Sequence, residues 1–282
     1  MAIIDGKKIA LEIRENLKKE VTALKKEGRP PGLAVILVGN DPASQTYVKM
    51  KERVAQELGI YSDMYFLDED VIEAELFDLI ESLNDERKID GILVQLPLPD
   101  HINSEMVIES IDPDKDIDGF HPANTGRLFS GQSEGLRFEA CTPLGIIELI
   151  ERHTEIDGKK AVIVGRSNIV GKPAAHLLLE KNATITICHS HTADLKKETL
   201  QADILVAAVG YPRLISGDMV KEGATVIDVG INRVDGKLVG DVDFEKAKEK
   251  AAYITPVPGG VGPMTIAMLM KNTIKARKYH GE

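Results

Sequence analysis

The sequence predicts an α/β fold of two lobes, each built around a mostly parallel β-sheet, with the C-terminal lobe Rossmann-like. Short, unbroken runs of Val, Ile and Leu, such as LAVILV at residues 33–38, alternate with charged segments of helical period along most of the chain. Unbroken apolar runs are typical of strands covered on both faces, and hence of parallel sheets flanked by helices. A stretch rich in Gly, Asn, Ser and Pro at residues 118–140 has no sustained period and separates the two lobes.

The same alternation orders the expected elements along the chain. Apolar residues three and four positions apart predict helices, which we place at residues 9–26, 44–58, 71–83, 143–153, 171–180 and 263–278. Short apolar runs predict strands, which we place at residues 33–38, 61–66, 91–94, 161–164, 183–188, 204–208 and 225–229.

The first lobe is not expected to be continuous in the sequence. The irregular segment TPVPGGVGP, at residues 255–263, precedes the last helix and lets that helix return to the first lobe. We therefore assign residues 1–120 plus 263–282 to the first domain, residues 121–140 to a linker and residues 141–262 to the second domain. Ligands of open α/β sheets bind beyond the carboxyl ends of the strands, and clefts between lobes are common binding sites.

Composition excludes several classes of protein. The 282 residues include 35 Lys and Arg and 45 Asp and Glu, a formal net charge of −10, without the basic block that nucleic-acid binding requires. Apolar residues make up 43%, enough for a folded core, yet no apolar run reaches the ~18 residues of a membrane span. No secretory signal pattern is visible, and Cys141 and Cys188 form no CxxC pair. We expect a cytoplasmic protein without nucleic-acid or membrane partners.

A glycine turn follows the strand predicted at residues 161–164. The chain reads GRSNIVGKP from Gly165 to Pro173 and then enters a helix. A strand, a glycine turn and a helix start form the setting in which backbone N–H groups hold a dinucleotide pyrophosphate. The spacing GxSxxxGxP differs from the common GxGxxG, so a plain turn is the alternative. The further strands that follow favour the nucleotide site.

The end of the next strand indicates which dinucleotide binds. Sites for NAD usually place Asp or Glu there, whereas this strand ends CHSHT at residues 188–192. A carboxylate would repel the 2′-phosphate of NADP, whereas a hydroxyl, imidazoles and the cation of Arg166 would not. The sequence therefore predicts NADP. His189 and His191 lack a third ligand at a recognisable spacing, so no metal is expected.

The helix predicted at residues 44–58 carries a lysine within its apolar stripe. The residues of one face are Tyr47, Lys51, Val54 and Leu58. A lysine at the edge of the stripe with its amine in solvent is one interpretation, and a partly desolvated amine usable for acid/base chemistry is the other. Gln95, in the run GILVQLPLP, is a second polar residue in an apolar setting. It needs hydrogen-bond partners unless it lies at an exposed strand end.

Two further segments are unusual. The sequence DKDIDG, which ends at Asp118 and Gly119, imitates the start of a calcium loop, but Thr125 stands where the bidentate Glu belongs, and we reject calcium. Asp118 suits binding the edge of a polar ring, with a plain turn as the alternative. The segment PVPGGVGPMT, from Pro256, predicts a shaped loop that opens at a helix N-terminus, or a tight loop of structural role only.

Together these segments closely resemble the bifunctional methylenetetrahydrofolate dehydrogenase/methenyltetrahydrofolate cyclohydrolase family. The resemblance spans almost the whole chain and depends on four motifs in order, ASQTYVKMK, GILVQLPLP with PDKDIDGF, GRSNIVGKP, and YITPVPGGVGPMT. It implies NADP-dependent oxidation of 5,10-methylene-tetrahydrofolate to the methenyl cation, then hydrolysis to 10-formyl-tetrahydrofolate at one shared site. That site would be a catalytic cleft between a folate-binding domain and an NADP-binding domain. The resemblance also implies a homodimer with its contact in the nucleotide lobe.

The resemblance implies roles for individual residues. Lys51 matches the catalytic lysine, Tyr47 the residue that stacks on the substrate and orients the lysine, and Gln95 the amide that holds it. Asp118 matches the carboxylate that binds the amino edge of the pterin. The loop beside the folate matches Gly259, Gly260, Val261 and Gly262. The positions lining the dinucleotide match Gly165, Arg166, Ser167, Ser190 and Ile231. His191 departs from the family, since many relatives carry Lys or Arg there, and this weakens the preference for NADP.

The expected chemistry fits these residues. Hydride leaves a carbon between two nitrogens that stabilise the cation, so the first step needs positioning more than an acid. Hydration of the cation needs a base for the water or a donor to the ring nitrogen, and Lys51 can serve either way. Two alternatives stay open. One is another two-lobe NADP-dependent dehydrogenase, which would not require Lys51, and the other is a catalytically silent folate- or nucleotide-binding protein.

Overall fold

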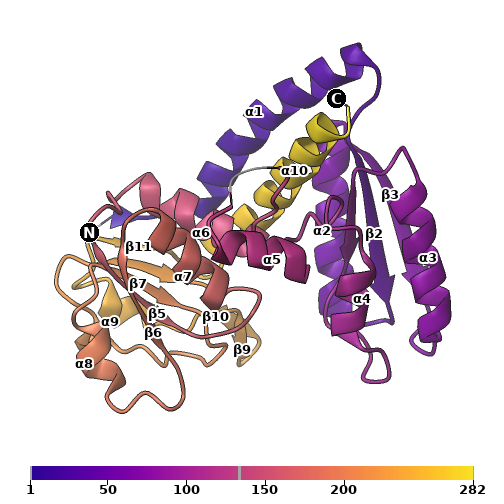
Figure 1. Ribbon diagram of the computed structural model, residues 1–282. Coiled ribbons are helices and arrows are strands. Elements are labelled where there is room, and N and C mark those ends of the chain that lie inside the picture. The colour runs from indigo at the N-terminus through magenta and orange to yellow at the C-terminus, as the bar shows by residue number, and fades with distance from the viewer. Residues whose placement is uncertain (1, 133–134, 282) are drawn as a thin grey trace. The chain divides into compact units, whose positions relative to one another are not determined.

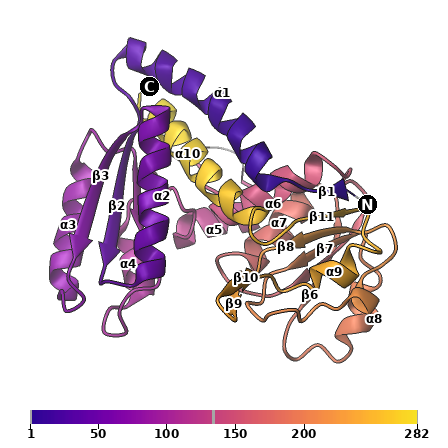
Figure 2. The same cartoon turned by 180° about the vertical axis from the view of Figure 1, so that it is seen from behind.

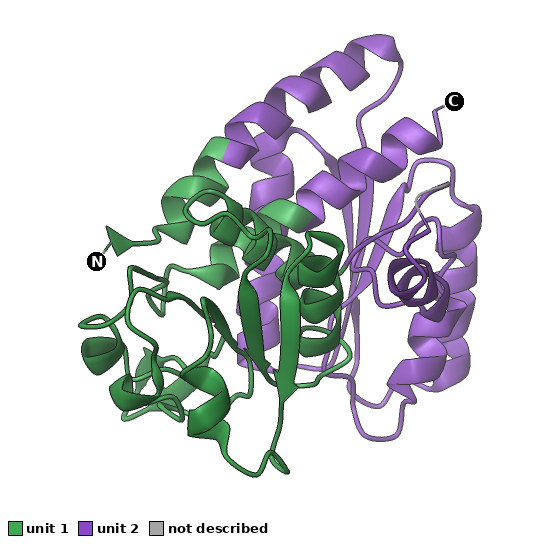
Figure 3. Cartoon of the chain, turned by 60° about the vertical axis from the view of Figure 1, so that its left-hand side comes forward, with its two compact units in different colours: residues 1–12, 140–268 green, residues 13–139, 269–282 purple. Residues whose placement is uncertain are grey.

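The chain divides into two units, each built on its own parallel sheet, in a computed structural model that describes residues 2–132 and 135–281 (Figure 3). Unit 1 consists of Met1–Glu12 and Ala140–Met268, and unit 2 of Ile13–Glu139 and Leu269–Glu282. The chain crosses from one unit to the other three times. Two of the crossings fall inside continuous helices, α1 (Gly6–Glu27) and α10 (Val261–Tyr279).

Unit 2 contains a three-stranded parallel sheet in the order β3-β2-β4. The strands are β2 (Gly32–Val38), β3 (Tyr61–Leu67) and β4 (Gly91–Val94). Every residue of β2 and β4 is buried, as predicted for strands covered on both faces, whereas β3 is a partly exposed edge. Figures 1 and 2 show this sheet between α2 (Pro42–Leu58) and α3 (Glu73–Asp85).

Shorter helices complete unit 2, together with the later part of α1 and of α10. They are α4 (Ser104–Ser110) and α5 (Pro122–Phe129). The core of the unit joins β2, β4 and α3 through side chains such as Ile36, Ile92 and Ile80, each 0% exposed. Burial of these aliphatic side chains is the main stabilising contribution to the unit.

Unit 1 contains a six-stranded parallel sheet in the order β1-β11-β8-β7-β5-β6. The strands are β1 (Ala2–Ile3), β5 (Lys160–Val164), β6 (Thr184–Cys188), β7 (Ile204–Ala207), β8 (Thr225–Asp228) and β11 (Tyr253–Ile254). The chain runs from β5 outward to β6 and then crosses to β7 on the opposite side of β5. A reversal of this kind is a topological switch point, where open α/β sheets bind ligands.

The remaining elements of unit 1 are helices and one antiparallel hairpin. The helices are α6 (Cys141–Glu151), α7 (Gly171–Glu180), α8 (Leu195–Thr199), α9 (Phe244–Ala247) and the 3-10 turn Gly217–Met219. The hairpin pairs β9 (Asn232–Val234) with β10 (Lys237–Val239). The core packs around Val162, Leu205 and Val226, each 0% exposed.

The predicted α/β class with mostly parallel sheets is confirmed. Every helix and strand predicted above is present with ends shifted by a few residues at most. Sequence reasoning missed the elements too short to show a period, among them β1, β11, α8, α9 and the β9–β10 hairpin. The segment 121–140, predicted to be an irregular linker, contains α5, because His121 caps its first turn and Pro122 starts it. No helix within residues 2–132 and 135–281 combines the length and the apolar character that crossing a membrane requires.

Candidate active site

Helix α2 places a lysine in the buried part of unit 2. Asp41 caps the helix by accepting a hydrogen bond from the Ser44 N–H at 2.7 Å, and Gly59 ends it in the left-handed conformation with a φ of 82°. Between these caps the helix buries one face, which includes Val48, Lys51, Val54, Ala55 and Leu58. Lys51 is only 4% exposed. The side chain is therefore buried, which favours a desolvated amine over one that extends into solvent from the edge of the stripe.

Two other predicted site residues, Gln95 and Tyr47, contact Lys51. The Lys51 Nζ donates a hydrogen bond to Gln95 Oε1 at 2.9 Å and lies 4.7 Å from the centre of the Tyr47 ring, a cation–π distance. Gln95 follows β4 directly, and its N–H donates to the carbonyl of Ile36 in β2 at 2.8 Å. Its Nε2 donates to the Leu96 carbonyl at 2.6 Å, which fixes the orientation of the side-chain amide. The lysine is thus held by a side chain that is itself fixed at the carboxyl end of the sheet.

Asp118 lies in a turn just after an isolated bridge to β4. Ile92 and Asp116 form this parallel bridge, and the Ile92 N–H donates to the Lys115 carbonyl at 2.8 Å. The chain turns directly afterwards, because the Gly119 N–H donates to the Asp116 carbonyl at 3.1 Å. The half-buried Asp118 therefore belongs to a turn of unit 2, the unit that also contains Gln95.

The turn after Asp118 closes on a carboxylate to which the sequence analysis gave no role. Asp116 is 2% exposed and accepts hydrogen bonds of 2.8–3.3 Å from the N–H groups of Gly119, Phe120 and His121 and from the side chain of Asn124. Burial raises the pKa of Asp116 to about 7, although these donors lower it. Asp116 lies within the DKDIDG sequence, whose spacing resembles a calcium loop, and its role in the turn was therefore not predicted.

Two buried asparagines support the same segment. Asn124 is 0% exposed, and its Nδ2 donates to Asp116 and to the Pro113 carbonyl, each at 2.9 Å. Asn272 of α10 is 2% exposed and donates from Nδ2 to the Ile117 carbonyl at 2.8 Å. The sequence contains one indication of this contact. Asn272 lies within the apolar run of α10, and a buried amide requires hydrogen-bond partners.

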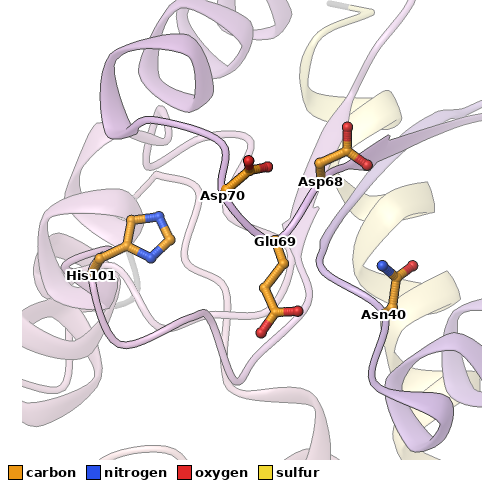
Figure 4. Close-up of a pocket in the computed structure, with 5 residues that line it drawn as sticks. All are labelled: Asn40, Asp68, Glu69, Asp70 and His101. Atoms are coloured by element: carbon orange, nitrogen blue, oxygen red, sulfur yellow. The ribbon is translucent and has the colours of Figure 1, made fainter.

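A cavity of about 660 Å³ opens near the ends of β2 and β3 in the same unit. Its lining is acidic and consists of Asn40, Asp68, Glu69, Asp70 and His101 (Figure 4). Figure 4 shows that the carboxylate of Glu69 points away from those of Asp68 and Asp70, so the three do not converge on one point. Across residues 2–132 and 135–281 no group of three or more His, Cys, Asp or Glu could hold a metal ion. None of the predicted site residues lines this cavity.

In unit 1 the glycine turn lies at the switch point of the six-stranded sheet. Gly165 follows β5 with a φ of 132°, and a Cβ there would lie 2.2 Å from the Ala208 carbonyl oxygen. A Cβ on Gly171 would lie 2.2 Å from the Gly165 carbonyl oxygen, so the start of α7 also needs glycine. The Ser167 Oγ accepts from the N–H groups of Val170 and Gly171, each at 3.2 Å, and shapes the turn. Glycines of this kind let backbone approach a phosphate closely, and the turn fits a dinucleotide.

The segment after β6 is polar, and its acid, Asp194, caps α8. Arg166 and Ser190 are exposed. The His189 Nδ1 accepts a hydrogen bond from the His191 N–H at 3.1 Å, and the Thr192 Oγ1 accepts one from the His189 N–H at 2.9 Å. These hydrogen bonds hold the turn at residues 189–192 in shape.

The glycine-rich loop before α10 also belongs to unit 1. Gly259 has a φ of 104°, and its carbonyl accepts from the Lys7 N–H at 3.0 Å. A Cβ on Gly260 would lie 2.6 Å from the Pro256 carbonyl oxygen. Val261 is 4% exposed and begins α10, with Gly262 in its first turn. The predicted site residues therefore fall in two groups, one in each unit.

Comparisons with known proteins agree with this geometry. The model of the tetrahydrofolate dehydrogenase/cyclohydrolase catalytic domain matches residues 4–118, and that of the NAD(P)-binding domain of the same family matches residues 140–281. The chain belongs to the tetrahydrofolate dehydrogenase/cyclohydrolase family. It is 71% identical over 280 residues to the bifunctional protein FolD of Halothermothrix orenii, with 99% of each chain covered.

Solved structures of the family have the same fold. The bifunctional FolD methylenetetrahydrofolate dehydrogenase/cyclohydrolase of Campylobacter jejuni is 52% identical, with a TM-score of 0.96 and 99% of each chain covered. FolD from Trypanosoma brucei, in complex with NADP and an inhibitor, is 40% identical, with a TM-score of 0.93 over 99% of this chain and 97% of that one. Membership of the tetrahydrofolate dehydrogenase/cyclohydrolase family confirms the predicted bifunctional activity and the NAD(P)-binding Rossmann-like lobe.

Proposed function

We propose that this chain oxidises 5,10-methylene-tetrahydrofolate with NADP⁺ and hydrolyses the methenyl product, with Lys51 as the catalytic residue of the hydrolysis. The observation that carries the assignment of Lys51 is its amine, buried in α2 and hydrogen-bonded to Gln95 at 2.9 Å. A positioned amine removed from bulk water is suited to transferring a proton to or from a reacting group.

In the first reaction the residues of unit 2 hold the substrate. The Tyr47 ring stacks on the folate, and the Asp118 carboxylate accepts hydrogen bonds from the amino edge of the pterin. NADP⁺ supplies the hydride acceptor when it is bound. The carbon that loses hydride lies between two nitrogens that share the positive charge, so positioning contributes more than acid catalysis.

In the second reaction Lys51 handles the protons. The oxygen of a water molecule bonds to the methenyl carbon and loses one proton. The bond from that carbon to N5 then breaks with its electron pair going to N5, N5 gains a proton, and the hydroxyl loses its second proton to become the formyl oxygen, so that one proton is released overall. Lys51 takes the proton from the water as an amine, or donates one to N5 as an ammonium. Gln95 Oε1 keeps the Nζ in place for either transfer.

The choice of NADP over NAD is supported by the turn after β6. No acidic side chain stands at residues 188–192, and the exposed Arg166 and Ser190 offer a cation and a hydroxyl for a 2′-phosphate. His191 stands where many relatives are expected to carry a cation, so we expect the preference to depend chiefly on Arg166.

We also expect a cytoplasmic homodimer that uses neither a metal nor a macromolecular partner for its chemistry. The resemblance to the family supports the dimer, and two buried cysteines that form no disulfide, Cys141 and Cys188, are typical of a reducing compartment. Sedimentation equilibrium at micromolar concentration should give twice the chain mass, and the chain mass would contradict the dimer.

An absorbance assay tests the proposed function. The purified protein is mixed with 5,10-methylene-tetrahydrofolate and either NADP⁺ or NAD⁺, and the reduced nicotinamide and the methenyl product are followed at their separate wavelengths. We expect turnover with NADP⁺ to exceed that with NAD⁺, and the methenyl absorbance to decay faster than in buffer. Equal rates with the two dinucleotides would contradict the NADP preference, and absence of turnover would contradict the proposed function.

A further inference from the structure

One buried carboxylate in unit 1 joins the two loops that leave β7 and β8. Asp241 is 0% exposed. Its Oδ2 accepts hydrogen bonds from the N–H groups of Val209 and Gly210, at 2.7 and 2.9 Å, in the loop after β7. Its Oδ1 accepts one from the Asn232 side chain, at 2.9 Å, in the segment after β8. Both oxygens of one side chain therefore connect the two loops.

A second carboxylate fixes Asp241 itself. Asp228, the last residue of β8, accepts hydrogen bonds from the N–H groups of Asp241 at 2.9 Å and of Gly230 at 3.0 Å. A Cβ on Gly230 would lie 2.2 Å from Asp241 Oδ1, and one on Gly240 would lie 1.8 Å from Asp228 Oδ2. The chain therefore passes directly over these carboxylates at two glycines, and such close packing leaves the loops little freedom to shift.

The joined loops each carry a large exposed side chain. Tyr211 follows Gly210 and is 63% exposed, and Ile231 follows Gly230 and is 65% exposed. Both lie just beyond the carboxyl ends of neighbouring strands, where Rossmann-like sheets bind their ligands. The Gly165 turn and the end of β6 are the places for the pyrophosphate and the adenosine ribose in that arrangement, so the nicotinamide half extends over β7 and β8.

We propose that Asp241 is a positioning residue of the dinucleotide site, which holds Tyr211 and Ile231 beside the nicotinamide half of the cofactor. This inference rests on the proposed function and extends it, because it gives Tyr211 a binding role and Asp241 an indirect one. Alanine at position 241 removes both carboxylate oxygens, so the N–H groups of Val209 and Gly210 and the side chain of Asn232 lose their shared acceptor. The connection between the two loops is therefore lost.

The test compares binding of NADP⁺ with binding of adenosine 2′,5′-bisphosphate, which is only the adenosine half of the ligand. Isothermal titration of the full-length Asp241→Ala protein should show NADP⁺ binding weakened about tenfold and bisphosphate binding within about twofold of the wild type. The matched control is Asp243→Ala, the same change two residues away, where the carboxylate pairs with Lys246 at 3.1 Å. Both ligands should bind this control as they bind the wild type.

A second pair of variants tests the inference where Asp241→Ala does not fold. Tyr211→Ala changes an exposed side chain and should weaken NADP⁺ binding about threefold or more without changing bisphosphate binding, whereas Tyr211→Phe should bind both ligands normally. Equal weakening of both ligands by Asp241→Ala, or unchanged NADP⁺ binding in Asp241→Ala or Tyr211→Ala, would overturn the inference. A wild-type protein that binds neither NADP⁺ nor NAD⁺ would overturn the proposed function together with it.

Discussion

The two units share a reversal of strand order but have different kinds of residue where the strands end. Each has a parallel sheet whose strand order reverses, between β2 and β4 in unit 2 and between β5 and β7 in unit 1. In unit 2 the end of β4 is followed by a polar side chain, Gln95, which accepts a hydrogen bond from Lys51. In unit 1 the corresponding position carries glycine, since any side chain at Gly165 would strike the Ala208 carbonyl.

The difference follows from what each kind of ligand requires. Proton transfer requires a functional group fixed at one point, which a side chain held by neighbours provides. A pyrophosphate is held by several backbone N–H groups at once, which requires that no side chain intervene. We therefore expect substitutions of Lys51 and Asp118 to affect the folate reactions and substitutions in the glycine turn after β5 to affect the dinucleotide, and the predictions below test that division.

The largest effect is expected at Lys51. Lys51→Met keeps the length of the buried side chain but removes the amine, so cyclohydrolase activity should fall by about 10²- to 10⁴-fold. Binding of NADP⁺, measured by titration, should stay within about twofold of the wild type, because the change lies in unit 2. Hydrolysis of the methenyl cation at the normal rate would remove Lys51 from the mechanism.

A smaller effect is expected at Asp118. Asp118→Ala should weaken folate binding about 10- to 100-fold, the usual range for losing a charged hydrogen-bond partner. Steady-state kinetics should show the change in KM for methylene-tetrahydrofolate, with KM for NADP⁺ unaltered. The exposed Asp100 is the control, and Asp100→Asn should leave both constants unaltered. An increase in KM for NADP⁺ of the same size would break the proposed division between the units.

Arg166 tests the division from the side of unit 1. Arg166→Ala should weaken NADP⁺ binding about tenfold and NAD⁺ binding much less, because only NADP⁺ carries the 2′-phosphate. Lys172 is exposed in the first turn of α7, and Lys172→Ala is the matched control because it also replaces a cation with alanine. An equal loss for the two dinucleotides would show that Arg166 does not contact the 2′-phosphate.

The smallest effect concerns pH and Asp116. The pKa of this carboxyl is about 7 in the folded protein and 3.8 in its unperturbed state, so the folded protein retains a proton that the unfolded chain releases. The contribution of this proton to the free energy of unfolding is fully present below pH ~4 and is lost as the pH rises through about 7. Asp116→Asn removes this titration. Between pH 4 and 8 the Tm of the wild type should therefore fall by a few degrees more than the Tm of Asp116→Asn. Parallel Tm profiles for the two proteins would contradict the raised pKa.

Sequence reasoning succeeded where one residue departs from a strong local pattern. Lys51 interrupts an apolar stripe of helical spacing, and Gln95 ends an apolar strand, so each was visible without any knowledge of its partner. Lys51 and Gln95 are 44 positions apart in the sequence, so only the structure identifies the 2.9 Å hydrogen bond between them. The fold class was equally visible, because unbroken apolar runs are an average property of many residues.

It failed where a buried residue acts through distant partners. Asn272 and Asp241 are buried polar residues whose hydrogen bonds go to backbone groups elsewhere in the chain. A sequence pattern does not contain those groups, and DKDIDG resembled a different motif. Elements such as β1 and β11 were missed because two residues show no period, although the sheet of unit 1 uses them as strands.

The pairing of β1 with β11 has a consequence for how the protein is made. Ala2 lies opposite Tyr253 in the sheet of unit 1, and unit 2 includes the end of α10, which is translated later still. Strand β1 therefore has no partner until residues 253–254 are synthesised, and unit 2 has no end of α10 until residues 269–279 are synthesised. Such long-range pairing slows folding, and a chain stalled late in synthesis would contain two incomplete units instead of one finished and one missing.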